Sequence, residues 1–267
     1  MSPALIELGP VELAVATLLV VAAGAVSVAL KLGIGRRLAI AALRTAVQLG
    51  LLGLVLEYVF RVERAGLVVL MVLAMTLFAA REAVSRSARG YRFIAVDAWF
   101  AIVASSLLVG GVVTQAVVGV TPWYAPQYVI PLVGMILGNS LTGISLCLDR
   151  FLEHLSARRA EIELRLAFGA NRSEALGEAL RAAVRTGMIP IVNAMAAAGV
   201  VSLPGMMTGQ ILAGSPPLQA VAYQIVVMFM IAAAVASGSM IVALLAGRRL
   251  VRPDGSLIRD RLQERES

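Results

Sequence analysis

The sequence is poor in the residues from which catalytic and metal sites are usually built. Charged residues make up 15% of its 267 residues, against ~25% in an average soluble domain. It has one cysteine, Cys147, and one histidine, His154, so an intrachain disulfide is excluded and no ligand cluster has metal-binding spacing. The single lysine, Lys31, is not part of a Gly-Lys-Ser/Thr sequence, which excludes a phosphate-binding loop for ATP. The sequence therefore supports neither catalysis nor a resident cofactor in this chain, and it leaves any metal site unassigned.

Hydrophobic residues, in contrast, make up 60% of the chain, more than one core of ordinary size can bury. The chain contains apolar runs of the length needed to cross a bilayer, ~20 residues as a helix. It lacks the strict alternation of a membrane barrel. We therefore predict an all-α, polytopic membrane helix bundle formed by a single domain, residues 1–267. The seven predicted spans are 11–30, 38–60, 66–80, 93–118, 128–148, 186–203 and 219–246.

Basic residues are concentrated in alternate connections between these spans. Outside these connections the sequence has only Arg61 and Arg64, which follow the second span, and Arg44 inside a span. By the positive-inside rule, the N-terminus lies outside and the C-terminus in the cytoplasm. The connection 149–185 and the tail 247–267 are then cytoplasmic. The net charge of +7 reflects this topology, and no nucleic-acid partner is expected.

The segment 202–217, "SLPGMMTGQILAGSPP", is uncharged and lies on the outer side in this topology. Ser202 is placed to cap a helix with Pro204 in its first turn, and Gly214 is placed to end it. Such a helix of ~10 residues would be ~15 Å long, about half a bilayer. We predict a short re-entrant helix at the outer mouth of the bundle. It is either a packing element or a gate that lines the substrate path.

The cytoplasmic connection 149–185 is predicted to form a helical hairpin. Gly169 is a suitable end for its first helix, and Asn171 with Glu174 forms a capping box for its second. Leucines and other apolar residues follow at helical spacing in the second helix, while residues 164–168 form an apolar tip. The hairpin can therefore pack on its own bundle or present its tip to a partner.

Polar residues inside the apolar spans, together with the two methionines of the outer segment, are candidates for the substrate path, because ionisable groups are costly within a membrane. Arg44 and Gln48 lie one turn apart, which puts them on one helix face. Alternative roles are pairing of Arg44 with Asp97, exposure of Glu57 to water at the membrane surface, and ordinary packing by the methionines. The candidates are Arg44, Gln48, Glu57, Asp97, Asn139, Met206, Met207 and Gln210.

Four stretches resemble the FetB-type iron-export permeases, to which plant aluminium-sensitivity proteins are related. They are "LRTAVQL", "IPLVGMILGNSLTGISL", "RLAFGANRSEA" and "VSLPGMMTGQILAGSPPLQAVAYQIVVMFM", which begin at Leu43, Ile130, Arg165 and Val201. The resemblance implies a permease subunit in a bacterial cytoplasmic membrane, coupled to a separate FetA-type ATPase that binds ATP and Mg²⁺. It also implies export of iron or another metal.

The hairpin sequence from Glu161 also resembles the loop that ABC-transporter permeases press against their ATPase subunits. The resemblance implies that the ATPase contacts are Glu163, Leu164, Phe168, Gly169, Ala170, Asn171 and Arg172.

Three aspects of the function stay open at this point. Hard cations such as iron prefer oxygen ligands, whereas Met206 and Met207 offer thioethers, and a plant relative is associated with a nucleotide sugar. A self-contained secondary transporter or channel, or an adaptor, is the alternative to an ABC permease. Because each chain has one docking loop and ATP-sandwich motors work in pairs, we predict a homodimer, with Gly134 and Gly138 at the interface.

Overall fold

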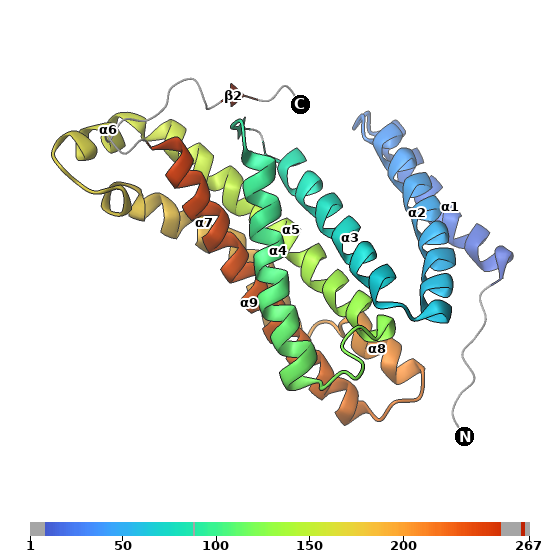
Figure 1. The fold of residues 1–267 in the computed structure, drawn as a ribbon. Helices are drawn as coiled ribbons and strands as arrows, with labels where there is room; N and C mark the ends of the chain where they lie inside the picture. Colours follow the sequence, from blue (N-terminus) through green and yellow to red (C-terminus); the bar gives the residue numbers. More distant parts are fainter. Residues whose placement is uncertain (1–8, 88, 252–262, 265–267) are drawn as a thin grey trace.

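The computed structural model describes residues 9–87, 89–251 and 263–264, and these form a bundle of helices (Figure 1). The helices are α1 (Pro10–Ala29), α2 (Gly35–Val62), α3 (Ala65–Ser85), α4 (Ile94–Val112) with its π-helical continuation η1 (Val113–Val117), α5 (Pro126–Ala157), α6 (Arg159–Ala167), α7 (Arg172–Ala197), α8 (Gly205–Leu212) and α9 (Pro217–Leu250). Two short strands, β1 (Arg89–Gly90) and β2 (Gln263–Glu264), pair antiparallel. The predicted all-α membrane bundle is confirmed.

The long helices alternate in direction, so the connections rich in arginine gather at one end of the bundle, the upper end in Figure 1. The α1–α2 turn, the α3–α4 connection, α6 and the end of α9 all lie there. The short helix α8 lies at the opposite end. This arrangement follows the positive-inside rule, which makes the upper end cytoplasmic and the α8 end the outer one.

Six helices are long and apolar enough to cross a membrane: α1, α2, α3, α4 with η1, α5 and α9. The seventh predicted span, 186–203, is not among them. Its residues 186–197 are the second half of α7, which begins at Arg172, carries charges in its first half and ends at Ala197, and residues 198–203 form the turn after it. The helix nevertheless runs from the cytoplasmic end towards α8 (Figure 1), packed against α5 and α9. The helix lies inside the bundle because one side of it packs against α5 and α9, although it is not apolar all round as a lipid-exposed span would be.

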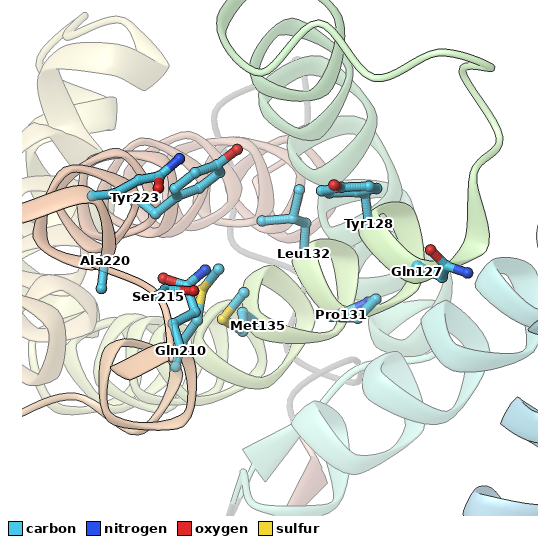
Figure 2. A pocket seen from close by; sticks show the side chains of 11 residues that line it. Gln127, Tyr128, Pro131, Leu132, Met135, Gln210, Ser215, Ala220 and Tyr223 are labelled. Carbon is cyan, nitrogen blue, oxygen red and sulfur yellow. The ribbon is translucent and has the colours of Figure 1, made fainter. Parts of the chain in front are cut away.

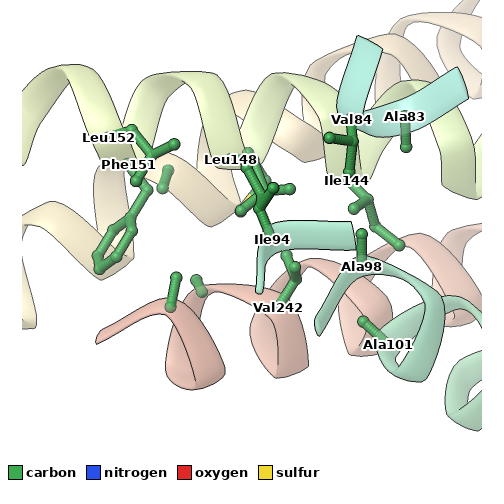
Figure 3. Close-up of a cluster of buried hydrophobic side chains, with 14 of the residues drawn as sticks. Ala83, Val84, Ile94, Ala98, Ala101, Ile144, Leu148, Phe151, Leu152 and Val242 are labelled. Carbon is green, nitrogen blue, oxygen red and sulfur yellow. The ribbon is translucent and has the colours of Figure 1, made fainter. Parts of the chain in front are cut away.

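The core is built around α5, which contacts α3, α4, α7 and α9. Figure 3 shows part of it, in which Leu148 and Phe151 of α5 belong to the same buried cluster as Val242 of α9. Glycines permit the closest approach: a Cβ atom on Gly187 of α7 would lie 2.7 Å from the carbonyl oxygen of Gly143 on α5. Backbones can come this near only where side chains are absent.

Helices α1 and α2 form a pair beside this core (Figure 1). Nearly all of their side chains are exposed, and the buried ones are Ser27 and Val59. Val59 packs with Val68 and Ile130 near the outer end of α2 and joins the pair to α3 and α5. Apolar side chains exposed in this way on membrane helices face lipid or another protein.

The short outer helix exists, but it begins later than predicted. Its N-cap is Pro204 and its first residue is Gly205. Ser202 does not cap it, because its carbonyl, which an N-cap would offer to the first helical turn, accepts from the Gly199 N–H in the turn after α7, and its own N–H donates to the Ala197 carbonyl in the same turn. Gly214, with a φ of 92°, follows the helix as predicted, since glycine adopts this left-handed conformation without strain.

Candidate functional site

A pocket of about 470 Å³ opens at the outer end of the bundle, between α5, α8 and α9 (Figure 2). The first turns of α5 and of α9 supply most of its walls, and α8 lies across one side. This explains what the uncharged outer segment does: it closes one wall of a cavity. The lining residues are Gln127, Tyr128, Pro131, Leu132, Met135, Met206, Gln210, Ser215, Gln219, Ala220 and Tyr223.

The lining has polar groups but no charged ones. It combines three glutamine amides, one serine hydroxyl and two tyrosine phenols with apolar side chains and two methionines. In the described part of the chain, none of these six polar side chains hydrogen-bonds to another protein group. A cavity with several convergent polar groups and apolar walls is the usual form of a small-molecule site.

Two of the predicted path residues, Met206 and Gln210, line this pocket, whereas Met207 does not. Asn139 lies one turn beyond Met135 on α5, is exposed, and donates its Nδ2 to the Met135 carbonyl at 2.9 Å. Asn139 thus places one polar group on the exposed side of α5, one turn beyond the pocket.

Most of the pocket's polar lining was missed by reasoning from the sequence. Tyr128, Tyr223 and the glutamines at positions 127 and 219 lie in the first turns of two spans, where polar residues are ordinary for a membrane surface. Their clustering at the outer ends of two separate spans was the available signal. Only the tertiary structure shows that these two ends are neighbours.

The other path candidates lie elsewhere. Arg44 and Gln48 are exposed one turn apart on α2, as predicted, and make no hydrogen bond within the described residues. Glu57 forms an exposed ion pair with Arg61 at 3.2 Å near the outer end of the same helix. Exposure of Glu57 to water at the membrane surface stays a prediction.

Asp97 pairs with Arg249 and not with Arg44, which corrects the predicted alternative. The Arg249 Nε lies 2.8 Å from Oδ1 and 2.7 Å from Oδ2 of Asp97, and the Tyr91 hydroxyl donates to Oδ2 at 2.8 Å. Burial raises the pKa of the Tyr91 phenol, and the Asp97 carboxylate raises it further, so this hydroxyl keeps its proton. The cluster joins the start of α4 to the end of α9 at the cytoplasmic end. Asp97 therefore joins α4 to α9 at the cytoplasmic end, opposite the end where the pocket opens.

The cytoplasmic hairpin of α6 and α7 has the predicted local structure. Asn171 accepts from the Glu174 backbone N–H at 2.9 Å, and Glu174 accepts from the Asn171 N–H at 2.8 Å. Gly169, with a φ of 88°, forms the turn between the two helices. The apolar stripe of α7 packs on its own bundle, with Leu176 buried. The tip does not: the Phe168 residue is 84% exposed.

The seven predicted ATPase contacts divide into exposed and anchored residues. Leu164 and Phe168 are exposed, whereas Glu163 is partly buried and is paired with Arg159 at 2.9 Å. Arg172 donates to the carbonyl oxygen of Val251 at 2.9 Å, which fixes the start of α7 to the end of α9. The exposed side chains of the hairpin thus project from a helix whose start is hydrogen-bonded to the bundle. The remaining three predicted contacts, Gly169, Ala170 and Asn171, are in the turn.

A multi-span helical bundle with an outer pocket and a braced cytoplasmic hairpin defines an integral membrane protein. The chain belongs to the uncharacterised protein family UPF0014, whose model matches residues 10–251. This agrees with the predicted resemblance to FetB-type permeases. Among the described residues, no three His, Cys, Asp or Glu side chains are grouped so that they could hold a metal ion.

Three relatives show the range of the family. The chain is 32% identical to the "probable iron export permease protein FetB" of Escherichia coli, over 95% of this chain and 96% of the relative. It is 39% identical to the UPF0014 membrane protein slr1647 of Synechocystis, over 70% and 73%. It is 30% identical to the protein ALUMINUM SENSITIVE 3 of Arabidopsis thaliana, over 74% and 71%. No solved structure matches the chain.

Proposed function

We propose that the chain is the permease subunit of an ABC exporter, driven by a separate FetA-type ATPase in a bacterial cytoplasmic membrane, and that it exports iron or another metal. The observation that carries the proposal is the α6–α7 hairpin, which presents an exposed phenylalanine at the tip of a braced, charged element. An exposed aromatic side chain at such a tip is typical of a docking contact. The ATPase supplies the ATP and Mg²⁺ sites that this sequence lacks.

The helices attached to the hairpin connect it to the pocket. The single helix α5 (Pro126–Ala157) begins with pocket residues and extends to α6. The other helix, α7 (Arg172–Ala197), begins at the hairpin turn and ends in the turn that precedes α8. Because helices behave as stiff rods, a displacement of the hairpin by the ATPase is transmitted to the α5 wall of the outer pocket and, through the turn after α7, to α8.

Substitution of the tip tests the proposal. We expect Phe168→Asp to abolish co-purification of a co-expressed FetA-type ATPase and ATP-dependent iron flux in vesicles, because a charge replaces the apolar anchor. Phe168→Leu keeps the apolar tip and should retain both activities. Val200→Asp, at a residue that is 88% exposed in the outer turn, is the matched control. Full complex formation by Phe168→Asp, or iron flux without ATP, would contradict the proposal and favour a secondary transporter or channel.

We propose further that two copies of the chain assemble around the path with two ATPases. Gly134 is used within the chain, since its Cβ position lies 3.4 Å from Met75, but a Cβ on Gly138 would meet nothing within 4 Å. Exposed Asn139 lies next to it, and a polar amide at this depth favours a protein neighbour over lipid. We expect mass measurement in nanodiscs to show a complex of two permease chains and two ATPase chains. An active complex with one chain of each would exclude the dimer.

A further inference from the structure

We propose that the outer pocket binds an uncharged, oxygen-rich organic ligand, either free or wrapped around a metal ion. This inference rests on the proposed function, because it concerns the cargo of that permease. It differs from transport of a bare cation, in which protein side chains replace the hydration shell of the ion.

The chemistry of the lining disfavours a site for a bare hard cation, because it offers neutral oxygens but no carboxylate. Such ions are held by several carboxylate or carbonyl oxygens at 2.0–2.6 Å, with carboxylates supplying the opposite charge. The pocket has no carboxylate, histidine or cysteine among its lining residues. A bare iron ion entering it would lose its hydration without gaining compensating charge, which is unfavourable at membrane depth.

The polar groups instead match hydroxyl and carbonyl groups on a ligand. Amides, hydroxyls and phenols both donate and accept hydrogen bonds while staying neutral. Gln210 and Ser215 lie close together on one side of the pocket with Tyr223 nearby, and Tyr128 lies across from them (Figure 2). With no partner among the described residues, these groups can bond to a ligand without first breaking bonds to the protein. The cost of binding is correspondingly low.

Size and shape point to an organic ligand as well. A pocket of about 470 Å³ lies within the range of small-molecule sites, ~300–1,000 Å³. Leu132 and Ala220 supply apolar wall, and the flexible thioethers of Met135 and Met206 adapt to an irregular outline. The tyrosine rings offer flat surfaces against which a sugar or a chelate ring can lie.

Equilibrium binding to the full chain in nanodiscs, without the ATPase, tests the inference. The probes are the neutral complex tris(maltolato)iron(III), sucrose as a metal-free polyol, iron(II) sulfate and silver nitrate. We expect at least one of the two neutral probes to bind, and the iron(II) ion not to bind at this site. The metal chelate and the polyol distinguish the two sources of the ligand.

The double variant Gln210→Leu and Gln219→Leu removes two amides from the pocket without changing any charge. We expect it to weaken binding of the neutral probe about 10- to 100-fold, as expected for two lost hydrogen bonds. Gln115→Leu, at an exposed position on η1 outside the pocket, is the matched control and should bind normally. Equal thermal unfolding of the variants shows that the fold is intact.

Three results would overturn the inference. One is iron(II) binding that the double variant abolishes. Another is silver binding that Met206→Leu abolishes and the double variant does not, which would make the pocket a thioether site for a soft cation. The last is failure of both neutral probes to bind. Since no ATPase is present, these failures are distinct from failure of the proposed function, which the Phe168 variants test separately.

Discussion

Replacing Arg249 by methionine removes the cation that pairs with the Asp97 carboxylate and keeps most of the side-chain volume. We expect this change to destabilise the bundle, and to do so more than Asp97→Asn does. The reason is an asymmetry in exposure, since the Asp97 side chain is 3% exposed and that of Arg249 is 36% exposed. A carboxylate left alone cannot reach water, whereas a guanidinium left alone can.

The magnitude follows from the contacts that remain. Without Arg249, the Asp97 carboxylate keeps only the Tyr91 hydroxyl, at 2.8 Å, among the hydrogen bonds described above. Leaving one member of a buried pair without its partner costs ~3–5 kcal/mol, and the partial exposure of Arg249 lowers our expectation to about 2–3 kcal/mol. For a chain of this size that corresponds to a fall in melting temperature of about 4–12 °C. Asp97→Asn keeps an acceptor for Tyr91, so we expect about half that effect.

The single cysteine provides the assay. Cys147 is fully buried in the core, so a maleimide dye that fluoresces on reaction reports its exposure as the purified protein is heated. Arg248→Met is the control, because Arg248 is the exposed neighbour on the same helix. Arg249→Met melting within 2 °C of Arg248→Met, or Asp97→Asn melting lower than Arg249→Met, would refute the reasoning.

Two further predictions concern packing and motion. Gly187→Ala should lower the free energy of unfolding by about 1–3 kcal/mol, because its Cβ would lie 2.7 Å from a carbonyl oxygen. Gly138→Ala, whose Cβ meets nothing within 4 Å, should change it by less than ~0.5 kcal/mol. The same dye assay measures both variants. Single cysteines at Met206 and Gln210, in a Cys147→Ala background, should be labelled from outside at different rates with and without trapped ATP, because α8 closes the pocket over the cargo. Equal rates in both states of a transporting complex would mean that α8 is a static wall.

Features set by neighbouring residues could be predicted from the sequence. The capping box of Asn171 and Glu174 and the left-handed turns at Gly169 and Gly214 each depend on a few consecutive positions, and each is present. The predicted N-cap of α8 was wrong by two residues, because both backbone groups of Ser202 are used in closing the preceding turn. A residue that looks like an N-cap in the sequence does not act as one when its backbone carbonyl and N–H are already hydrogen-bonded in another turn.

By itself, the sequence determined that the chain is a membrane helix bundle, and it predicts which connections are cytoplasmic. Apolar length and arginine placement decide these through the cost of putting charge and free backbone groups in lipid. The tertiary structure alone decided that Asp97 meets Arg249, 152 residues away, and that the first turns of α5 and α9 share a pocket with α8. Those pairings depend on which helix faces fit together, as where Gly143 meets Gly187. Hydrophobic pattern cannot reveal that fit, because in a membrane the contacting and lipid-facing sides of a helix are both apolar.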